Sequence, residues 1–430
     1  MEQTERRIDG TKQDRKSASA GKDRRSFRAA AMAIAFALAV VSMQSAQAQT
    51  YTVLHNFTGG QDGGTSFAAL TMDRAGNLYG TTYYGGSANQ GVVFKLTRKG
   101  GSFVFNTLHS FGNGEGIGSY SKVTIGPDGS LYGTTQTGVS GPGCGGMGCG
   151  TVYNLRLPPT ACKAALCDWS YSLVYQFPDG GANGALPTSA PIFDQNGNML
   201  GATPGDLGQC CGNVYELKPS NGNWTQSVLY SFTGGSDGNY PTGDVIWDQA
   251  GNLYGVTYMG GTHGGGVVYQ MVPSGSGWTE NVLYSFDATS DPDGGLVFDK
   301  SGNLYGTTTG DGGSGIGTVF MLSPAGGAWT STVLYTFSKW EEPRSSLVMD
   351  AAGNLYGTAD RGGKERGGTI FKLTPGNGGW TYTLLKEFDD PCDEGCFPRG
   401  GVILDASGNL YGTTSGGGTH GQGVVYEITP

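Results

Sequence analysis

Two histidines stand in matching Gly-Gly-Thr-His-Gly segments of this chain, at His263 and His420. Imidazole is a common metal ligand and acid–base group. No carboxylate or third histidine shares their spacing, so we interpret both as loop residues rather than a metal pair. Similar loops carry Asp-Gly pairs, as in Gly234 to Gly238 (GGSDG). These pairs form turns, and calcium binding is the alternative, although no loop matches a complete EF-hand pattern. The sequence therefore predicts no cofactor, with Ca²⁺ as the open alternative.

Aromatic residues in the same glycine-rich loops could stack on sugar rings, or could serve packing alone. Tyr120 and Tyr240 belong to this group of unusual loop residues. The candidate ligand-binding residues are Tyr83, Tyr84, Tyr258, His263, Trp340 and His420. The chain shows no Ser-His-Asp order, no P-loop and no Gly-x-Ser-x-Gly elbow, so it indicates no catalytic residue.

Eight cysteines lie after residue 48, and an even count in an exported protein favours disulfides. Local pairs are the simplest arrangement: Cys144–Cys149, Cys162–Cys167 and Cys392–Cys396. The adjacent Cys210 and Cys211 either form a strained vicinal bridge or pair with Cys144 and Cys149. Zinc is the alternative, but no histidine accompanies these cysteines, so we predict no metal.

A repeated phrase shows how these residues are positioned. Asp-x-x-Gly-Asn-Leu-Tyr-Gly-Thr, as at Asp299 to Thr307, occurs seven times, and two of the copies are degraded. The copies lie 51 to 68 residues apart, a period typical of propellers and other repeat arrays. Each unit reads as four short strands with turns between them. Trp278 and its counterparts read as packing wedges between units, and His55 and His109 replace an outer-strand tyrosine.

Seven such units predict an all-β fold, a seven-bladed propeller of four-stranded antiparallel blades. In this arrangement Gly295 to Asp299 (GLVFD) is an innermost strand. The first strand, Tyr51 to Phe57, is expected to complete the last blade beside Val424 to Ile428 and to close the ring. A β-solenoid is the alternative fold. We attribute the glycine after each Leu-Tyr to close packing between neighbouring sheets.

The repeated GNLYGTT, followed by glycine-rich residues and VVFKL or TVFML, resembles the GloVer tandem-repeat family of exported "choice-of-anchor" bacterial proteins. The resemblance covers residues 49–430 and implies an exported repeat protein, often with a C-terminal sorting anchor. This chain stops at Pro430 without one. The family implies no established activity. GLVFD-x-x-GNLYG also resembles NHL-type propeller repeats.

Residues 1–48 are typical of an export signal, with a basic start, an apolar run from Ala29 to Met43 and an Ala46-Gln47-Ala48 cleavage site. Arg24-Arg25 resembles a twin-arginine motif, and an ordinary Sec signal is the alternative. We expect a periplasmic or extracellular monomer with no membrane span after cleavage. The net charge of −9 argues against nucleic acid and anionic membranes as partners.

These observations favour an exported, non-enzymatic binding or scaffold propeller whose partners are glycans or cell-surface proteins. A lyase or glycan-cleaving enzyme, with its site on the channel face, is the alternative. The Asp/Gly loops leave calcium-stabilised adhesion as a third hypothesis. Fold alone does not decide among them.

Overall fold

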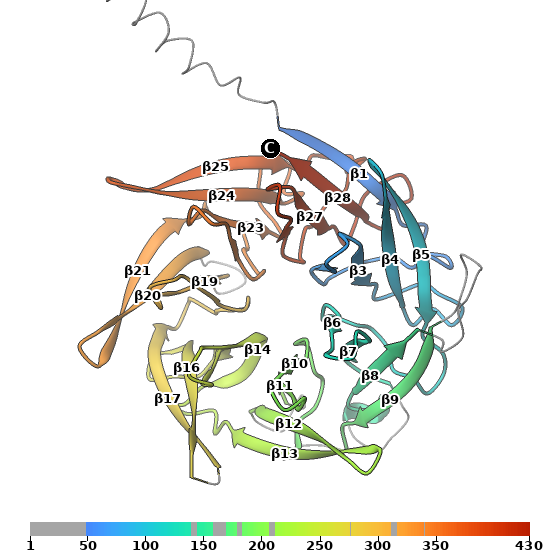
Figure 1. Ribbon diagram of the computed structural model, residues 1–430. Helices are drawn as coiled ribbons and strands as arrows, with labels where there is room; N and C mark the ends of the chain where they lie inside the picture. Colours follow the sequence, from blue (N-terminus) through green and yellow to red (C-terminus); the bar gives the residue numbers. More distant parts are fainter. Residues whose placement is uncertain are drawn as a thin grey trace, which may run out of the picture. The chain divides into compact units, whose positions relative to one another are not determined.

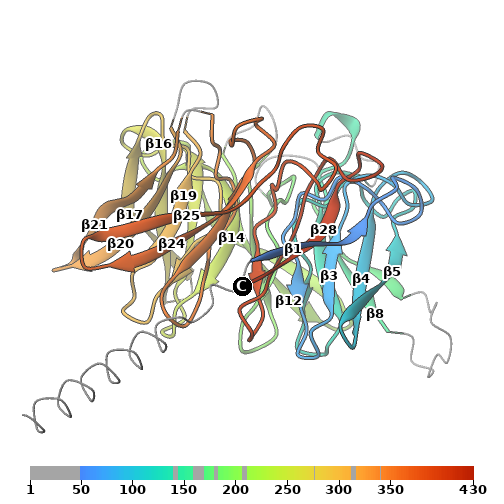
Figure 2. The same ribbon diagram turned by 90° about the horizontal axis from the view of Figure 1, so that it is seen from above.

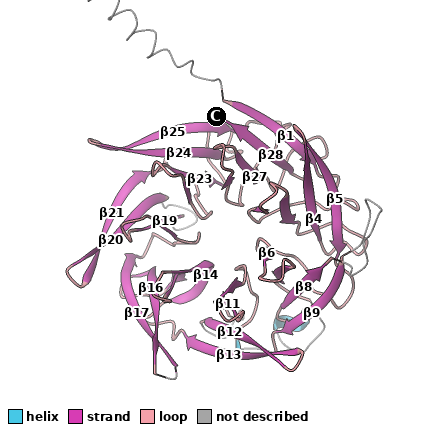
Figure 3. Cartoon of the chain, in the orientation of Figure 1, coloured by secondary structure: helices cyan, strands magenta, loops and turns pink. Residues whose placement is uncertain are grey.

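Seven antiparallel sheets of four strands each are arranged in a ring around a central axis in the computed structural model (Figure 1). The structure describes residues 49–138, 144–157, 169–178, 183–205, 211–275, 277–310, 316–338 and 340–430. Thr50–Thr429 forms one compact unit. Strands and loops make up nearly all of the described chain (Figure 3). The predicted seven-bladed propeller is therefore confirmed.

Each blade is numbered in chain order and begins with its innermost strand. Blades 1 to 3 comprise β2 (Thr71–Met72), β3 (Leu78–Thr81), β4 (Val92–Lys99) and β5 (Ser102–Ser110); β6 (Thr124–Ile125), β7 (Leu131–Thr135), β8 (Thr151–Arg156) and β9 (Ser170–Gln176); β10 (Ile192–Phe193), β11 (Met199–Thr203), β12 (Asn213–Ser220) and β13 (Asn223–Ser231). Blades 4 and 5 comprise β14 (Asn239–Trp247), β15 (Leu253–Met259), β16 (Gly264–Ser274) and β17 (Gly277–Asp287); β18 (Val297–Phe298), β19 (Leu304–Thr308), β20 (Thr318–Ala325) and β21 (Ala328–Thr336). Blades 6 and 7 comprise β22 (Val348–Met349), β23 (Leu355–Ala359), β24 (Thr369–Gly376) and β25 (Gly379–Glu387); β26 (Ile403–Leu404), β27 (Leu410–Thr413), β28 (Val424–Thr429) and β1 (Thr50–Asn56). A short 3₁₀ turn, η1, covers Cys144–Gly146.

The first strand closes the ring as the sequence predicts. β1 pairs antiparallel with β28, from Thr50 opposite Thr429 to Asn56 opposite Val424. Figure 2 shows the two strands beside each other from a second direction. Blade 7 therefore combines one strand from the start of the propeller with three from its end, which covers the edge of β28 and closes the ring. No helix among the described residues is long and apolar enough to span a membrane.

The aspartate, asparagine and tyrosine of the repeated phrase form one hydrogen-bonded turn. Asp299 Oδ1 accepts from the backbone N–H groups of Ser301 and Asn303, at 2.8 and 2.9 Å. Its Oδ2 accepts from Asn303 Nδ2 at 2.7 Å and from the Tyr305 hydroxyl at 3.0 Å. We call this hydrogen-bonded turn the latch. It also forms at Asp73, Asp248, Asp350 and Asp405. The phrase thus has a structural role, because this turn joins strands one and two in five of the seven blades.

The strand glycine makes room for an aromatic ring of the same blade. In every blade it stands directly opposite a Phe or Tyr of the third strand, as Gly306 stands opposite Phe320. A Cβ on Gly306 would lie 2.6 Å from the ring of Phe320 and 3.0 Å from Leu296. The predicted close approach is real, but the main contact is with the neighbouring strand rather than with another sheet.

Threonines of the second strand join neighbouring blades. The Thr307 hydroxyl donates to the Ser345 carbonyl of blade 6, at 3.2 Å. Thr413 donates to the Ala68 carbonyl at 3.0 Å, which ties blade 7 to blade 1. Thr81, Thr134 and Thr358 make the equivalent bonds. The aromatic wedges also act between blades, since Trp380 of blade 6 packs edge-on against Tyr305 of blade 5, with ring centroids 6.0 Å apart.

Candidate functional site

The central channel holds a cavity of about 410 Å³. Its walls are the innermost strands and the turns that lead into them. Ile246, Val297, Val348 and Ile403 line one part, and charged and aromatic side chains line another. Its size falls in the range of small-molecule sites, which combine apolar walls with a few polar groups.

One repeat position supplies most of the chemistry. It lies four residues before the inner-strand residue that Val297 represents, and each blade contributes one side chain to the cavity. We call these residues the channel ring: Phe67, Tyr120, Thr188, Thr242, Asp293, Arg344 and Arg399. All seven are partly exposed. The side chain at this position changes from aromatic to Thr, Asp and Arg around the ring, so the chemistry of the channel is not symmetric.

The backbone before the channel ring is unusual. In six blades the residue two positions before the ring residue has a positive φ, as at Asp291 (50°) and Phe397 (59°). Such a conformation costs energy for residues other than glycine, and it is found where the surrounding structure fixes it, often at functional sites. The channel-ring side chain that lines the cavity follows two residues after this position.

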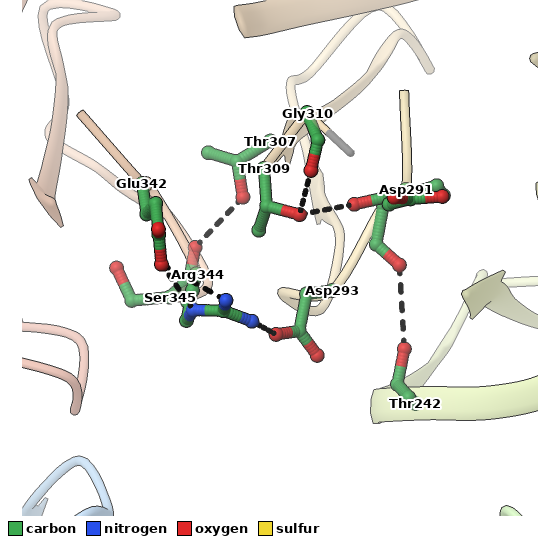
Figure 4. A network of polar contacts seen from close by, with 10 residues as sticks. Thr242, Asp291, Asp293, Thr307, Thr309, Gly310, Glu342, Arg344 and Ser345 are labelled. Carbon is green, nitrogen blue, oxygen red and sulfur yellow. Dashed lines mark hydrogen bonds and ion pairs between the residues drawn. The ribbon is translucent and has the colours of Figure 1, made fainter. Parts of the chain in front are cut away.

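Blades 5 and 6 contribute an ionic cluster (Figure 4). Arg344 Nη1 lies 3.0 Å from Asp293 Oδ2, and its Nη2 lies 2.9 Å from Glu342 Oε2. Burial opposes the charge of Arg344, but the two carboxylates outweigh it and raise the arginine pKa. Thr307, Thr309 and Thr242 extend the network through carbonyl groups. The cluster is a rigid set of donors and acceptors on one side of the channel.

Lys122 and Asp244 form an ion pair between blades that are not neighbours. Lys122 Nζ of blade 2 lies 2.9 Å from Asp244 Oδ2 of blade 4. Asp244 Oδ1 also accepts the Ala190 N–H of blade 3 at 2.7 Å. The charge of Asp244 raises the Lys122 pKa more than burial lowers it. Although Lys122 lies deep in the ring, 39% of its side chain remains accessible, because it faces the cavity.

Blades 7, 1 and 2 contribute an aromatic cluster. The rings of Phe67 and Tyr120 are stacked, with centroids 5.0 Å apart and planes 9° apart. Tyr83 meets both rings edge-on, and burial with the neighbouring tyrosines raises its pKa to about 12. The Arg399 guanidinium carbon lies 5.1 Å from the Phe67 ring centre. Gly118 is required here, because a Cβ would lie 2.2 Å from the Tyr83 ring.

The structure separates the six predicted ligand residues. Tyr83 lies in the aromatic cluster, and Tyr258 lies near the ionic cluster, where burial and then the charge of Asp291 raise its pKa. Tyr84 and Trp340 are 47% and 40% exposed, and Arg366 covers the Trp340 ring at 5.5 Å. His263 and His420 are exposed on loops of blades 4 and 7, which are not adjacent. None of the six is among the residues that line the cavity, whereas Tyr120, another of the unusual loop residues, is.

Two of the predicted local disulfides are present, Cys144–Cys149 and Cys392–Cys396. Because Cys144 and Cys149 bind each other, the proposed bridges from them to Cys210 and Cys211 are wrong. Cys211 is disulfide-bonded, whereas Cys162, Cys167 and Cys210 lie outside the described residues.

The Asp/Gly loops use their carboxylates locally. Asp237 Oδ2 accepts from the Thr233 N–H at 2.7 Å and from the Tyr230 hydroxyl at 3.0 Å. His55 and His109 occupy the equivalent of Tyr230 and contact Asp62 and Glu115, at 3.0 and 2.8 Å, which fits their predicted structural role. Among the described residues, no group of three or more His, Cys, Asp or Glu side chains could hold a metal ion.

Sequence reasoning missed Asp293, Arg344 and Arg399, because each looks like an ordinary loop charge. They share one repeat position, and the sequence marks it. A proline directly precedes the ring residue in blades 3 to 7, and the ring residue itself changes from Thr to Asp to Arg. Aligning the seven repeats on the Asp-x-x-Gly phrase would have identified the position.

A family model matches residues 39–163, 144–342 and 290–430. The chain belongs to the Gloeobacter/Verrucomicrobia repeat family. This membership agrees with the resemblance of the GNLYGTT repeats. A comparison with curated proteins finds no match.

Solved propellers resemble this ring. A proposed 6-phosphogluconolactonase from Bacteroides uniformis is 13% identical with a TM-score of 0.49, over 76% of this chain and 85% of that one. A protein of unknown function from Dyadobacter fermentans is 10% identical with a TM-score of 0.45, over 89% and 99%. A proposed glucose dehydrogenase from Thermus thermophilus is 16% identical with a TM-score of 0.43, over 88% and 99%. These likenesses concern the fold alone.

Proposed function

We propose that the protein is an exported, non-enzymatic binding propeller that holds a glycan unit in its central channel. The observation that carries this proposal is the aromatic cluster of Phe67, Tyr83 and Tyr120 beside Arg399. Aromatic rings offer large, rigid apolar area for the C–H faces of sugars, and the polar groups around them can bind hydroxyls. Export rests on the signal-like residues 1–48, and the two disulfides are compatible with it.

The charged groups of the cavity fit a binding role. Arg344 and Lys122 are held by carboxylates, so their side chains are oriented before a ligand arrives. Preorganised donors lower the entropy lost when a ligand binds. Gln136, Thr188 and Thr242 also line the cavity and add uncharged hydrogen-bonding groups.

The test is binding of the purified protein to a broad glycan array, followed by titration of any hit with variants. We expect Tyr120→Ala and Phe67→Ala to weaken binding about tenfold, because each removes a stacking partner. Trp340→Ala is the matched control, since Trp340 is exposed and lies outside the channel cavity. A blank array, or a hit that only Trp340→Ala weakens, would contradict a glycan site in the channel.

Asp360 favours a second candidate function, a glycan-cleaving enzyme. Burial raises the pKa of Asp360 despite the nearby charges of Arg399 and Arg344, and Glu342 raises it further. A carboxylic acid with a raised pKa can protonate a leaving group. Incubation of array hits with the protein would test this function. Product release that Asp360→Asn abolishes would support the enzyme, and intact glycans after prolonged incubation would exclude it for those ligands.

A further inference from the structure

A second cavity of about 360 Å³ lies away from the channel, between blades 4 and 5. Tyr284 and Phe286 of β17 line it from blade 4, and Phe320 and Ser331 line it from blade 5. Tyr284 and Phe286 meet nearly at right angles, with centroids 4.9 Å apart, and Phe286 and Phe320 lie 5.0 Å apart. Three aromatic rings therefore form a cage that opens beside Ser331.

The other blade interfaces show what this cage normally contains. Between blades 5 and 6 the equivalent of Ser331 is Tyr382, which stacks on Tyr335 with centroids 4.3 Å apart and planes 14° apart. Tyr382 also packs against Phe337 and Phe371, at 6.2 and 5.9 Å. Tyr335, Phe337 and Phe371 correspond to Tyr284, Phe286 and Phe320. An aromatic side chain thus fills the same cage one blade further along.

The pattern holds around the ring. Between blades 7 and 1, Phe105 stacks on His55 at 3.9 Å, and between blades 1 and 2, Tyr171 stacks on His109 at 5.0 Å. Tyr51 packs against Phe388 and Tyr426 between blades 6 and 7. Between blades 2 and 3, Gln226 fills the cage and accepts a hydrogen bond from the Tyr175 hydroxyl at 2.7 Å. Glu280 occupies the cage between blades 3 and 4. Serine is the smallest of these seven residues.

We propose that the cage between blades 4 and 5 is a binding site for a planar aromatic ring, which stacks on Tyr284 in the place that Tyr382 occupies in the next interface. Phe286 and Phe320 enclose the ring, and the hydroxyls of Thr308, Thr318 and Ser331 offer polar contacts at the cavity wall. The apolar side chains of Ile316 and Val333, 48% and 55% exposed, lie at its opening. A small cavity with three aromatic rings in its wall favours planar guests that can stack on those rings.

The site is independent of the glycan proposed for the channel, because the two cavities share no lining residue. Two sources of the ring share this chemistry: a free aromatic compound and an aromatic side chain of another protein. Indole and N-acetyltyrosinamide represent them in the experiment. Cyclohexanol, of similar size but not planar, is the control ligand.

Saturation-transfer NMR on the purified protein measures binding of each probe. We expect transfer to indole but not to cyclohexanol, unchanged by Ser331→Ala and abolished by Ser331→Tyr, which fills the cage as Tyr382 does. Transfer to N-acetyltyrosinamide as well would extend the site to protein side chains, and its absence would restrict the site to free aromatics. Should Ser331→Tyr not fold, Tyr284→Ala must abolish the indole signal instead.

A second variant tests the reasoning in the opposite direction. Tyr382→Ser should open an equivalent cage between blades 5 and 6, so the number of indole sites should rise from one to two. Absence of indole binding to the wild type, or equal transfer in wild type and Ser331→Tyr, would overturn the proposal. If Tyr382→Ser still has one indole site, the proposed position of the ring, in the place that Tyr382 occupies, would be overturned.

Discussion

The packing around the strand glycine makes a quantitative prediction. In blades 1, 5 and 6 the aromatic opposite the glycine is Phe, and the inner-strand neighbour is Leu70, Leu296 or Leu347, with Cδ2 2.7–3.0 Å from the position of a glycine Cβ. In the other four blades the aromatic is Tyr, and the neighbour is the smaller Val or Pro. The Tyr426 hydroxyl lies 2.3 Å from the position of a Cβ on Gly412. The tyrosine hydroxyl therefore takes the space of the leucine methyl group.

Blade 7 offers the test, because Tyr426 and Val402 are 0% and 1% exposed, and the Tyr426 hydroxyl has no hydrogen-bond partner among the described residues. Val402→Leu alone should cost about 1–3 kcal/mol, since its extra methylene meets the hydroxyl. In the Tyr426→Phe background the same change should gain about 0.8 kcal/mol from the buried methylene. The coupling energy between the two positions should therefore be about 3 kcal/mol.

Urea unfolding of wild type, both single variants and the double variant measures the coupling. Fluorescence and circular dichroism must give the same transition, so that free energies can be compared. The reverse pair in blade 5, Leu296→Val with Phe320→Tyr, is the matched control and should show coupling of the same sign. Additive effects, with coupling below about 0.5 kcal/mol in both blades, would refute the packing argument.

Four further outcomes are expected. Asp299→Ala should lower the free energy of unfolding by about 1–3 kcal/mol in urea titrations, because it removes the acceptor of four hydrogen bonds, whereas the exposed Asp287→Ala should change little. These hydrogen bonds outweigh burial and lower the pKa of the five latch aspartates, so stability should be present above pH 3.8 and be lost as pH falls below it; equal melting temperatures at pH 5 and pH 2.5 would contradict this. Burial and then the charge of Asp237 raise the pKa of Glu280 from 4.5 to about 7, so its proton stabilises the fold below pH 4.5 and this stability is lost as pH rises toward 7; Glu280→Gln should therefore melt higher than wild type at pH 8 and alike at pH 4. Thr307→Val should cost about 1 kcal/mol, since blade 4 already accommodates Val256 there, and a neutral result would show that the bond between blades does not contribute.

The repeated phrase predicted the blades, the innermost strand and the closing strand, because each of these depends on residues close in sequence or on the identity of the repeats. The contacts of the channel ring could not be predicted from the sequence in the same way. Arg344 meets Asp293 across 51 positions, and Lys122 meets Asp244 across an intervening blade. Such contacts exist only after the ring closes, so the residues carry no local signature. The cage at Ser331 is harder still to predict from the sequence. Only a comparison of all seven blades shows that Ser331 is small where four of its six counterparts are aromatic.

The pairing of β1 with β28 also determines how the ring responds to force. Thr50 lies opposite Thr429, so the two ends of the propeller leave the sheet side by side. A load that pulls these ends apart acts across the strands and breaks the hydrogen bonds of the pair one at a time, starting from Thr50. The ring should therefore peel open at blade 7 under low force, while the other six blades, each a continuous stretch of chain, resist until the closure has failed.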